Sequence, residues 1–218
     1  MRGKLQRFEE NRKRHNVLEP GKFGYEETKG SWKTIFKNEN DIVLEVGCGK
    51  GEYTVGLARV LPHRNFIGID IKGDRIWVGS KIAEEEQLPN AFFLRTELSF
   101  LGKFFESEEV SEIWITFPDP RPKKREMKRR LTHPRFMELY RGVLKKDGWI
   151  KFKTDNGPLF EYTLETLSSG ELKVRNLSYT FDLYNSPLNE EHHGIKTKYE
   201  QMFHAKGEKI KYMKFQFV

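Results

Sequence analysis

The sequence has little cysteine, no long apolar run and no internal repeat. Its single cysteine, Cys48, excludes an internal disulfide and fits a reducing compartment. No apolar stretch approaches the length of a membrane span, and the first residues are basic and polar, unlike a signal peptide. The composition therefore predicts a soluble, cytoplasmic protein with no membrane partner.

Positive charge is concentrated in two short segments. The formal net charge is +7, of which residues 1–15 carry +4 and Lys123–Arg130 carry +5, so the rest of the chain is slightly acidic. Such concentration predicts a polyanionic partner that docks at defined places. Solvated surface is the alternative for either segment, as is a nuclear-import signal for the second.

The most informative segment is Leu44–Gly51, an apolar run that ends in an acid and continues into three alternating glycines. Glycine allows a sharp strand-to-helix turn and a close approach of the backbone to a ligand. The spacing G-x-G-x-G, with Glu45 ahead of it, is typical of S-adenosylmethionine (SAM) sites, whereas dinucleotide loops read G-x-G-x-x-G. A second apolar run ends at Asp70, which is placed to accept hydrogen bonds from the ribose hydroxyls. The loop glycines are Gly47, Gly49 and Gly51.

Apolar runs alternate with helical patterns along most of the chain, which predicts parallel strands joined by right-handed crossovers. The last fifty residues alternate instead like paired antiparallel strands. We therefore predict a Rossmann-like α/β fold, with a seven-stranded, mostly parallel sheet, an antiparallel last strand and helices on both faces. Residues 1–40 are expected to form a basic arm with a short helix, and residues 41–218 the catalytic domain. The expected strands are 42–46, 65–70, 91–94, 112–116, 149–153, 173–184 and 209–218.

Four acids, Glu45, Asp70, Glu97 and Asp119, lie at or just after the carboxyl ends of predicted strands. In such a sheet the ligand lies in the crevice outside these ends. A ligand with hydroxyl, amino and sulfonium groups, such as SAM, suits four carboxylates, whereas the phosphates of a dinucleotide would be repelled. Two prolines bracket Asp119 and fix the backbone around it, so we expect it to have a functional role. The simpler alternative is an Asx-turn in a proline-rich loop.

From Phe117 onward the chain resembles the tRNA (guanine-N7)-methyltransferase family, of the TrmB type. The similarity rests on Phe-Pro-Asp-Pro at 117–120, the basic residues of 123–131, Lys-Thr-Asp-Asn at 153–156 and Thr-Lys-Tyr-Glu at 197–200. Together with the glycine loop, these motifs span residues 44–200 in the family order. The chain differs at Arg95–Leu98, where the family usually has Asp-Ala, and at Arg121, where many members have Trp.

The resemblance implies SAM as the methyl donor and tRNA as the partner, with a variable-loop guanosine, at tRNA position 46, as the target. It implies that Asp119 is catalytic, and it assigns three further groups of residues. Those expected at the cofactor are Glu45, Gly47, Gly49, Gly51, Asp70, Glu97 and Asp119; at the substrate nucleotide Lys123, Asp155, Thr197, Lys198, Tyr199 and Glu200; and at RNA Arg125, Lys128, Arg129 and Arg130. Either a monomer or a homodimer is compatible with the sequence.

Guanine N7 has a lone pair and no proton, so its methylation needs alignment and no general base. Asp119 would stabilise the cationic product, and Asp155 or Glu200 would accept hydrogen bonds from the Watson–Crick edge of guanine. His192 and His193 have no third ligand at useful spacing, so we expect no metal.

Three other functions agree less well with the sequence. An amino-group methyltransferase would need an aromatic residue after Asp-Pro-Pro, and here Arg121 and Pro122 follow Pro120. A non-catalytic RNA-binding subunit would not need the intact glycine loop and four acids. An NAD-dependent oxidoreductase is opposed by the loop spacing and by the lack of a Tyr-x-x-x-Lys pair.

Overall fold

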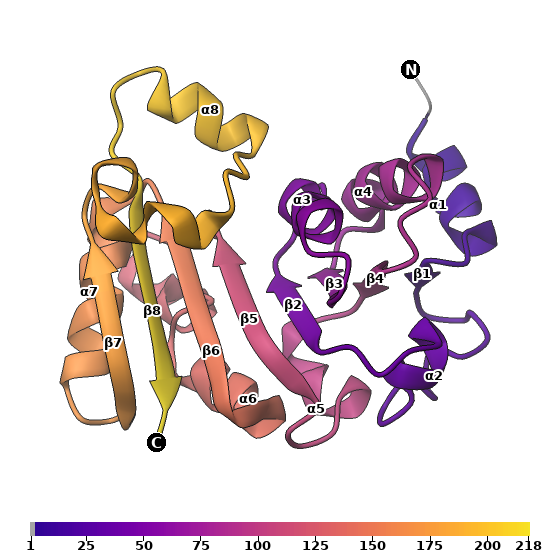
Figure 1. The fold of residues 1–218 in the computed structure, drawn as a ribbon, viewed down its shortest axis with the longest axis horizontal. Helices are drawn as coiled ribbons and strands as arrows, with labels where there is room; N and C mark the ends of the chain where they lie inside the picture. Colours follow the sequence, from indigo (N-terminus) through magenta and orange to yellow (C-terminus); the bar gives the residue numbers. More distant parts are fainter. Residues whose placement is uncertain (1–2) are drawn as a thin grey trace.

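The computed structural model describes residues 3–218, which form one mixed eight-stranded sheet (Figure 1). The strand order is β1-β4-β3-β2-β5-β6-β8-β7. The pairs from β1 to β6 are parallel, and β8 runs antiparallel to both β6 and β7. The strands are β1 (Val17–Leu18), β2 (Ile42–Val46), β3 (Asn65–Asp70), β4 (Ala91–Arg95), β5 (Val110–Thr116), β6 (Leu144–Thr154), β7 (Val174–Thr180) and β8 (Lys211–Phe217).

Helices cover both faces of the sheet. The α-helices are α1 (Lys4–Lys13), α2 (Trp32–Phe36), α3 (Glu52–Val60), α4 (Gly73–Glu85), α5 (Leu101–Phe104), α6 (Pro134–Val143), α7 (Gly157–Ser168) and α8 (Lys198–His204). Short 3₁₀ helices are η1 (Leu98–Phe100), η2 (Lys124–Arg129), η3 (Leu183–Asn185) and η4 (Pro187–His192). In Figure 1 the arrowheads of β5 and β6 point towards α8, so α8 lies at the carboxyl end of the sheet.

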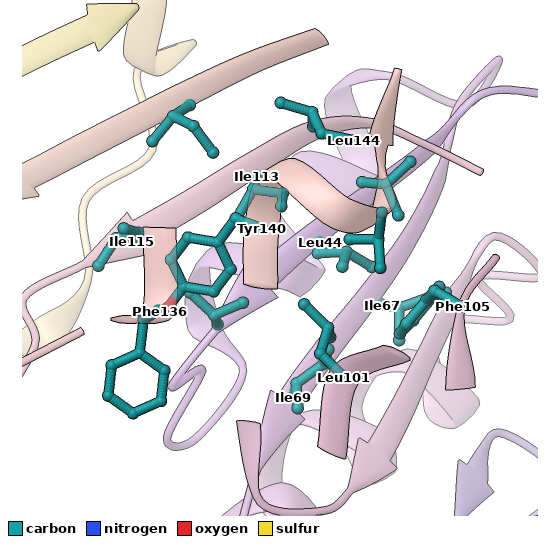
Figure 2. Packing of buried hydrophobic residues seen from close by; sticks show 14 of the residues in the cluster. Leu44, Ile67, Ile69, Leu101, Phe105, Ile113, Ile115, Phe136, Tyr140 and Leu144 are labelled. Carbon is teal, nitrogen blue, oxygen red and sulfur yellow. The ribbon is translucent and has the colours of Figure 1, made fainter. Parts of the chain in front are cut away.

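The alternation of side chains along each strand divides the core in two. On one face, Leu44 of β2 and Ile113 of β5 pack with residues of α5 and α6, such as Leu101 and Tyr140 (Figure 2). On the other face, residues of α3, α4 and the segment around η3 pack on Trp114 and its neighbours. Both faces are therefore buried in the centre of the sheet, which leaves the strand ends as the places for ligands.

The fold class is confirmed, and the strand count is one higher than we predicted. The additional strand, β1, has two residues and pairs in parallel with β4 at the sheet edge. It lies in the segment that we expected to be a basic arm, which also contains α1. Two residues are too few to give a recognisable alternation, which explains the omission. The boundary after residue 40 stays a prediction.

The N-terminal segment packs against α4. Asn11, buried in α1, donates from Nδ2 to the carbonyl of Gly73 at 2.8 Å. Arg14 donates to the carbonyl of Trp77 at 3.1 Å and forms an ion pair with Glu84. α1 is thus fixed beside the first turn of α4, which directly follows the end of β3. Within residues 3–218, no helix is long and apolar enough to cross a membrane.

Candidate active site

The glycine loop joins β2 to α3 and turns back over the end of β3. Gly47, Gly49 and Gly51 all have positive φ, at 73°, 56° and 69°. A Cβ atom at Gly47 would lie 2.9 Å from Leu131, and one at Gly51 would lie 2.4 Å from the ring of Phe93. Both the backbone conformation and the packing therefore require glycine at these two positions.

Glu45, at the end of β2, is buried under this loop. Its Oε2 accepts hydrogen bonds from the backbone N–H of Thr54, at 2.8 Å, and from the Thr54 hydroxyl. Its Oε1 accepts one from the hydroxyl of Thr116. Burial raises the pKa of Glu45 to about 7, although the hydrogen bonds from Thr116 and Thr54 oppose the shift. The carboxylate thus connects β2, α3 and β5 at the floor of the site, and its expected contact with SAM stays a prediction.

The larger of two adjoining clefts, of about 760 Å³, opens beside the loops that follow β3, β4 and β5. Its lining includes Asp70, Glu97 and Asp119, so the structure brings three of the four acids to one cavity. Asp70 accepts hydrogen bonds from the backbone N–H groups of Gly49, at 2.9 Å, and Lys72, at 2.8 Å. These bonds hold its carboxylate at the rim of the glycine loop.

The same cleft also contains positive charge, which we did not predict from the acids at the strand ends. Its basic lining residues are Lys72, Arg75, Arg121, Arg129 and Arg135. They come from α4 and the turn before it, the Asp119 loop, η2 and α6, and no spacing in the sequence links them. The cleft therefore combines carboxylates with cations, which suits a ligand that carries both ammonium and carboxylate groups.

The loop around Asp119 has an unusual backbone. Phe117 and Arg121 have φ values of 46° and 45°, a left-handed conformation that is uncommon for residues other than glycine. The Asp119 side chain is 62% exposed and forms an ion pair with Arg121 at 3.1 Å. Arg130 donates to the carbonyls of Pro120, at 3.1 Å, and Arg121, at 3.2 Å. The loop is thus supported from outside by a residue of the basic segment.

A second cleft, of about 340 Å³, adjoins the first and shares Gly47, Arg75 and Phe117 with it. Glu45, the fourth acid, lines this cleft, and Thr197, Lys198 and Tyr199 form its opposite wall. Tyr199 packs against Phe117, with ring centroids 5.6 Å apart, and donates from its hydroxyl to Asp155 at 3.3 Å. The structure therefore brings three residues of the C-terminal motif to the glycine loop.

Glu200, the fourth residue of that motif, is fully buried and its carboxylate faces away from solvent. It forms an ion pair with Lys153 at 2.7 Å, and the hydroxyl of Tyr184 also donates to it. Of the two carboxylates that we considered for guanine, Asp155 is therefore the more accessible, since it is half-buried.

The basic segment forms the 3₁₀ helix η2 beside the larger cleft. The side chains of Lys123, Arg125, Lys128 and Arg129 are exposed, and Arg129 reaches the cleft lining. Arg130 differs because its guanidinium binds the Asp119 loop and lies 4.3 Å from the ring centre of Tyr162. The four exposed side chains thus present positive charge to solvent, whereas Arg130 supports the Asp119 loop.

His192 lies outside both clefts. Its ring nitrogens are 3.1 Å from the carbonyl of Ile195 and from Oδ1 of Asn189. No group of three His, Cys, Asp or Glu side chains within residues 3–218 is arranged to hold a metal ion.

Comparison with known proteins identifies the family. A family described as putative methyltransferase matches residues 39–213. The chain is 50% identical over 217 residues to the tRNA (guanine-N(7)-)-methyltransferase of Cytophaga hutchinsonii, covering 100% of this chain and 98% of that one. It is 46% identical over 220 residues to the enzyme of the same name from Christiangramia forsetii, covering 98% and 97%.

Among solved structures, the 16S rRNA methyltransferase KamB superposes with a TM-score of 0.62, covering 87% of this chain and 93% of that one. At 16% identity this likeness shows the fold alone, which is the class I methyltransferase fold. The matches to the two curated relatives extend over nearly the whole chain, so both clefts are built from matched segments. The chain belongs to the tRNA (guanine-N7)-methyltransferase family of SAM-dependent enzymes.

Proposed function

We propose that this protein transfers the methyl group of SAM to N7 of a guanosine in the variable loop of tRNA, at position 46. One observation carries the proposal: the loop after β5 places Asp119 in the large cleft and continues directly into the exposed basic helix η2. A single segment thus joins the reaction site to a surface for phosphates. The curated relatives are named tRNA (guanine-N(7)-)-methyltransferases, which supports tRNA as the substrate. We expect the reaction to take place in the cytoplasm.

The clefts fit SAM in both size and chemistry. Their volumes, about 760 and 340 Å³, lie within the range of small-molecule sites. Asp70 would bind the ribose hydroxyls and Glu97 the adenine amine, and the basic side chains of the cleft would meet the methionine carboxylate. The glycine loop would let its backbone approach SAM closely, because Gly47, Gly49 and Gly51 have no side chains. When bound, SAM supplies an electrophilic methyl group on a sulfonium.

Asp119 would act through its charge. The N7 atom of guanine needs no deprotonation, so the protein must align the base and stabilise the positive charge that develops on it. Pro118, Pro120 and Arg130 hold the backbone around Asp119, so its exposed carboxylate is available for this role. The carboxylate would exchange its ion pair with Arg121 for the cationic purine.

Residues at the wall of the smaller cleft would recognise guanine. Tyr199 and Phe117 offer aromatic surface against which an unstacked base can lie. Asp155, hydrogen-bonded to Tyr199, can accept from the N1–H and amino groups of guanine. Adenine lacks this pair of donors, so Asp155 would lose these hydrogen bonds with adenine in the site, which favours guanine.

The direct test is to incubate the protein with labelled SAM and unmodified tRNA, digest the RNA and identify the methylated nucleoside. We expect 7-methylguanosine. Methylation of an exocyclic amine would support the amino-group alternative, and SAM binding without any transfer would support a non-catalytic subunit. Light scattering on the purified protein would distinguish a monomer from a homodimer.

A further inference from the structure

The helix α8 forms a wall of the smaller cleft, yet none of its apolar residues is fully buried. Within α8, all of which the structure describes, Glu200 is the one buried residue. Met202 and Tyr199 are 48% and 44% exposed. A surface helix is normally held by a buried apolar stripe, whereas α8 has the ring contact of Tyr199 with Phe117, so polar interactions contribute more to its position.

The main interaction is a buried ion pair between Glu200 and Lys153. Both side chains have 0% exposure, and the Lys153 Nζ lies 2.7 Å from Oε1 of Glu200. Lys153 belongs to β6 and also donates to the carbonyl of Ile195, at 3.1 Å. The hydroxyl of Tyr184 donates to the same carboxylate. Lys153, near the end of β6, is thus connected to the chain on both sides of Thr197, the N-cap of α8.

Glu200 also organises the first turn of α8. Its Oε2 accepts a hydrogen bond from the backbone N–H of Thr197, at 3.2 Å, while the Thr197 hydroxyl accepts one from the N–H of Glu200, at 3.1 Å. This is a capping box, which fixes the start of a helix. Glu200 therefore both caps the start of α8 and pairs with Lys153 of β6.

The geometry of the cleft follows from this attachment. Lys198, one residue after the cap, donates from its backbone N–H to Glu52, at 2.6 Å, in the first turn of α3. Tyr199 donates to Asp155, which follows Lys153 by two residues. A shift of α8 would therefore move Thr197 and Tyr199 relative to Phe117 and the glycine loop. A buried ion pair contributes little net stability, but removal of one partner leaves an uncompensated charge.

We propose that Lys153 and Glu200 are positioning residues for methyl transfer, because their buried ion pair fixes α8 so that Thr197 and Tyr199 hold the target base against Phe117. This inference rests on the proposed function. It assigns Glu200 to the support of the base-binding wall and not to direct contact with guanine. Lys153, in β6, supports the same wall through its ion pair with Glu200.

The test compares Glu200→Gln, Lys153→Met and the double variant in steady-state kinetics with tRNA. We expect kcat to fall by about tenfold or more in each single variant, because a misplaced base loses alignment. KM for tRNA should stay within about threefold, since the phosphate contacts that dominate affinity lie elsewhere. SAM affinity, measured by calorimetry, should also change by less than about threefold. The double variant should lose no more than the worse single variant, because the two residues act as a unit.

A matched control lies on the same strand. Lys151 is also buried in β6 and forms ion pairs with Glu112, at 3.4 Å, and Glu191, at 3.2 Å. Lys151→Met therefore removes a buried lysine of the same kind without disturbing the cap of α8. We expect a lower melting temperature in this variant, with kcat within about threefold of the parent protein.

Hydrogen exchange provides a readout that does not depend on activity. Amides of residues 197–204 should exchange faster, by about fivefold or more, in the Glu200 and Lys153 variants but not in Lys151→Met. Unchanged exchange in α8, or a loss of kcat equal to that of the Lys151 control, would overturn the inference. If the parent protein did not methylate tRNA at all, the proposed function would fail, and the exchange data would still decide whether the ion pair holds α8.

Discussion

Arg130 donates two hydrogen bonds to the main-chain carbonyl of Arg121, from Nε at 3.3 Å and from Nη2 at 3.2 Å. Arg121 is one of the two residues of the Asp119 loop with left-handed backbone conformation. Such a conformation persists only where the surroundings stabilise it. The last arginine of the basic segment thus provides part of this support, so the segment that we propose for RNA docking is physically connected to the loop that carries Asp119.

The exposed part of the basic segment should govern the affinity for tRNA. Replacing Arg125, Lys128 and Arg129 with glutamine should flatten the plot of log K against log salt by roughly 0.7–0.9 for each phosphate that is no longer neutralised. Fluorescence titration with tRNA at several salt concentrations measures this slope. As a control, Arg141, Lys146 and Lys173 can be neutralised together, since they lie outside both clefts. A slope unchanged in the first variant would mean that η2 is merely solvated surface.

Replacement of Arg130 should have a different effect from replacement of its neighbours. Arg130→Gln should lower kcat by about tenfold, because the Asp119 loop loses the hydrogen bonds that Arg130 donates to the carbonyls of Pro120 and Arg121. The salt slope should change little, whereas Lys128→Gln should flatten it. A reduced slope with normal turnover in Arg130→Gln would contradict the supporting role and show a phosphate contact.

Asp119 should affect methyl transfer more than cofactor binding. Asp119→Ala should reduce turnover by roughly 10² or more, because a charge that stabilises the cationic purine is removed. Single-turnover rates with saturating SAM and tRNA measure the transfer step, and calorimetry checks that SAM still binds. Turnover within about threefold of the parent protein would exclude a catalytic role.

Asp70 should determine the affinity for SAM. Asp70→Ala should weaken binding by about tenfold or more, the equivalent of one charge-assisted hydrogen bond to the ribose. Calorimetric titration gives this value directly, and Asp74→Ala is a matched control because Asp74 does not line either cleft. Equal affinities in the Asp70 variant and the parent protein would remove Asp70 from the cofactor site.

Glu45 should make the stability of the folded protein depend on pH. Its pKa is raised to about 7 in the folded state from 4.5, so between these pH values the folded protein holds a proton that the unfolded chain has released. The contribution to stability is therefore full below about pH 4.5 and is lost as the pH rises to about 7, by roughly 3 kcal/mol in total. Urea unfolding without SAM should show this decline in the parent protein, and a much smaller one in Glu45→Gln. Parallel pH profiles would contradict the raised pKa.

The sequence was sufficient for the parts of the fold that are governed by local pattern. The bounds of β2 and β3 agree with the prediction because each is a nearly continuous apolar run with an acid at or near its end. The position of Asp70 and Asp119 in one cleft follows from the rule that parallel strands end at the same edge. The bounds of β6 were less accurate, since we predicted a strand over 149–153 and β6 begins five residues earlier, at Leu144.

The inward-facing charges could not be predicted in the same way. Arg130 is one of six basic residues in eight, and nothing in that run distinguishes the one that turns towards Pro120. Lys153 alternates with apolar residues like an exposed strand residue, yet it is fully buried because Glu200, far along the chain, covers it. Long-range pairing determines the environment of such groups, and single-sequence patterns contain no information about it.

The two-residue strand β1 has a consequence for solubility. Without it, β4 would be the end of the sheet, and its central residues Phe92, Phe93 and Leu94 form an apolar strand that could pair with another chain. β1 occupies that edge, and it is itself too short to offer a long template for pairing. A chain shortened to begin after Leu18 would therefore expose the backbone of β4, and aggregation through this edge is the expected result.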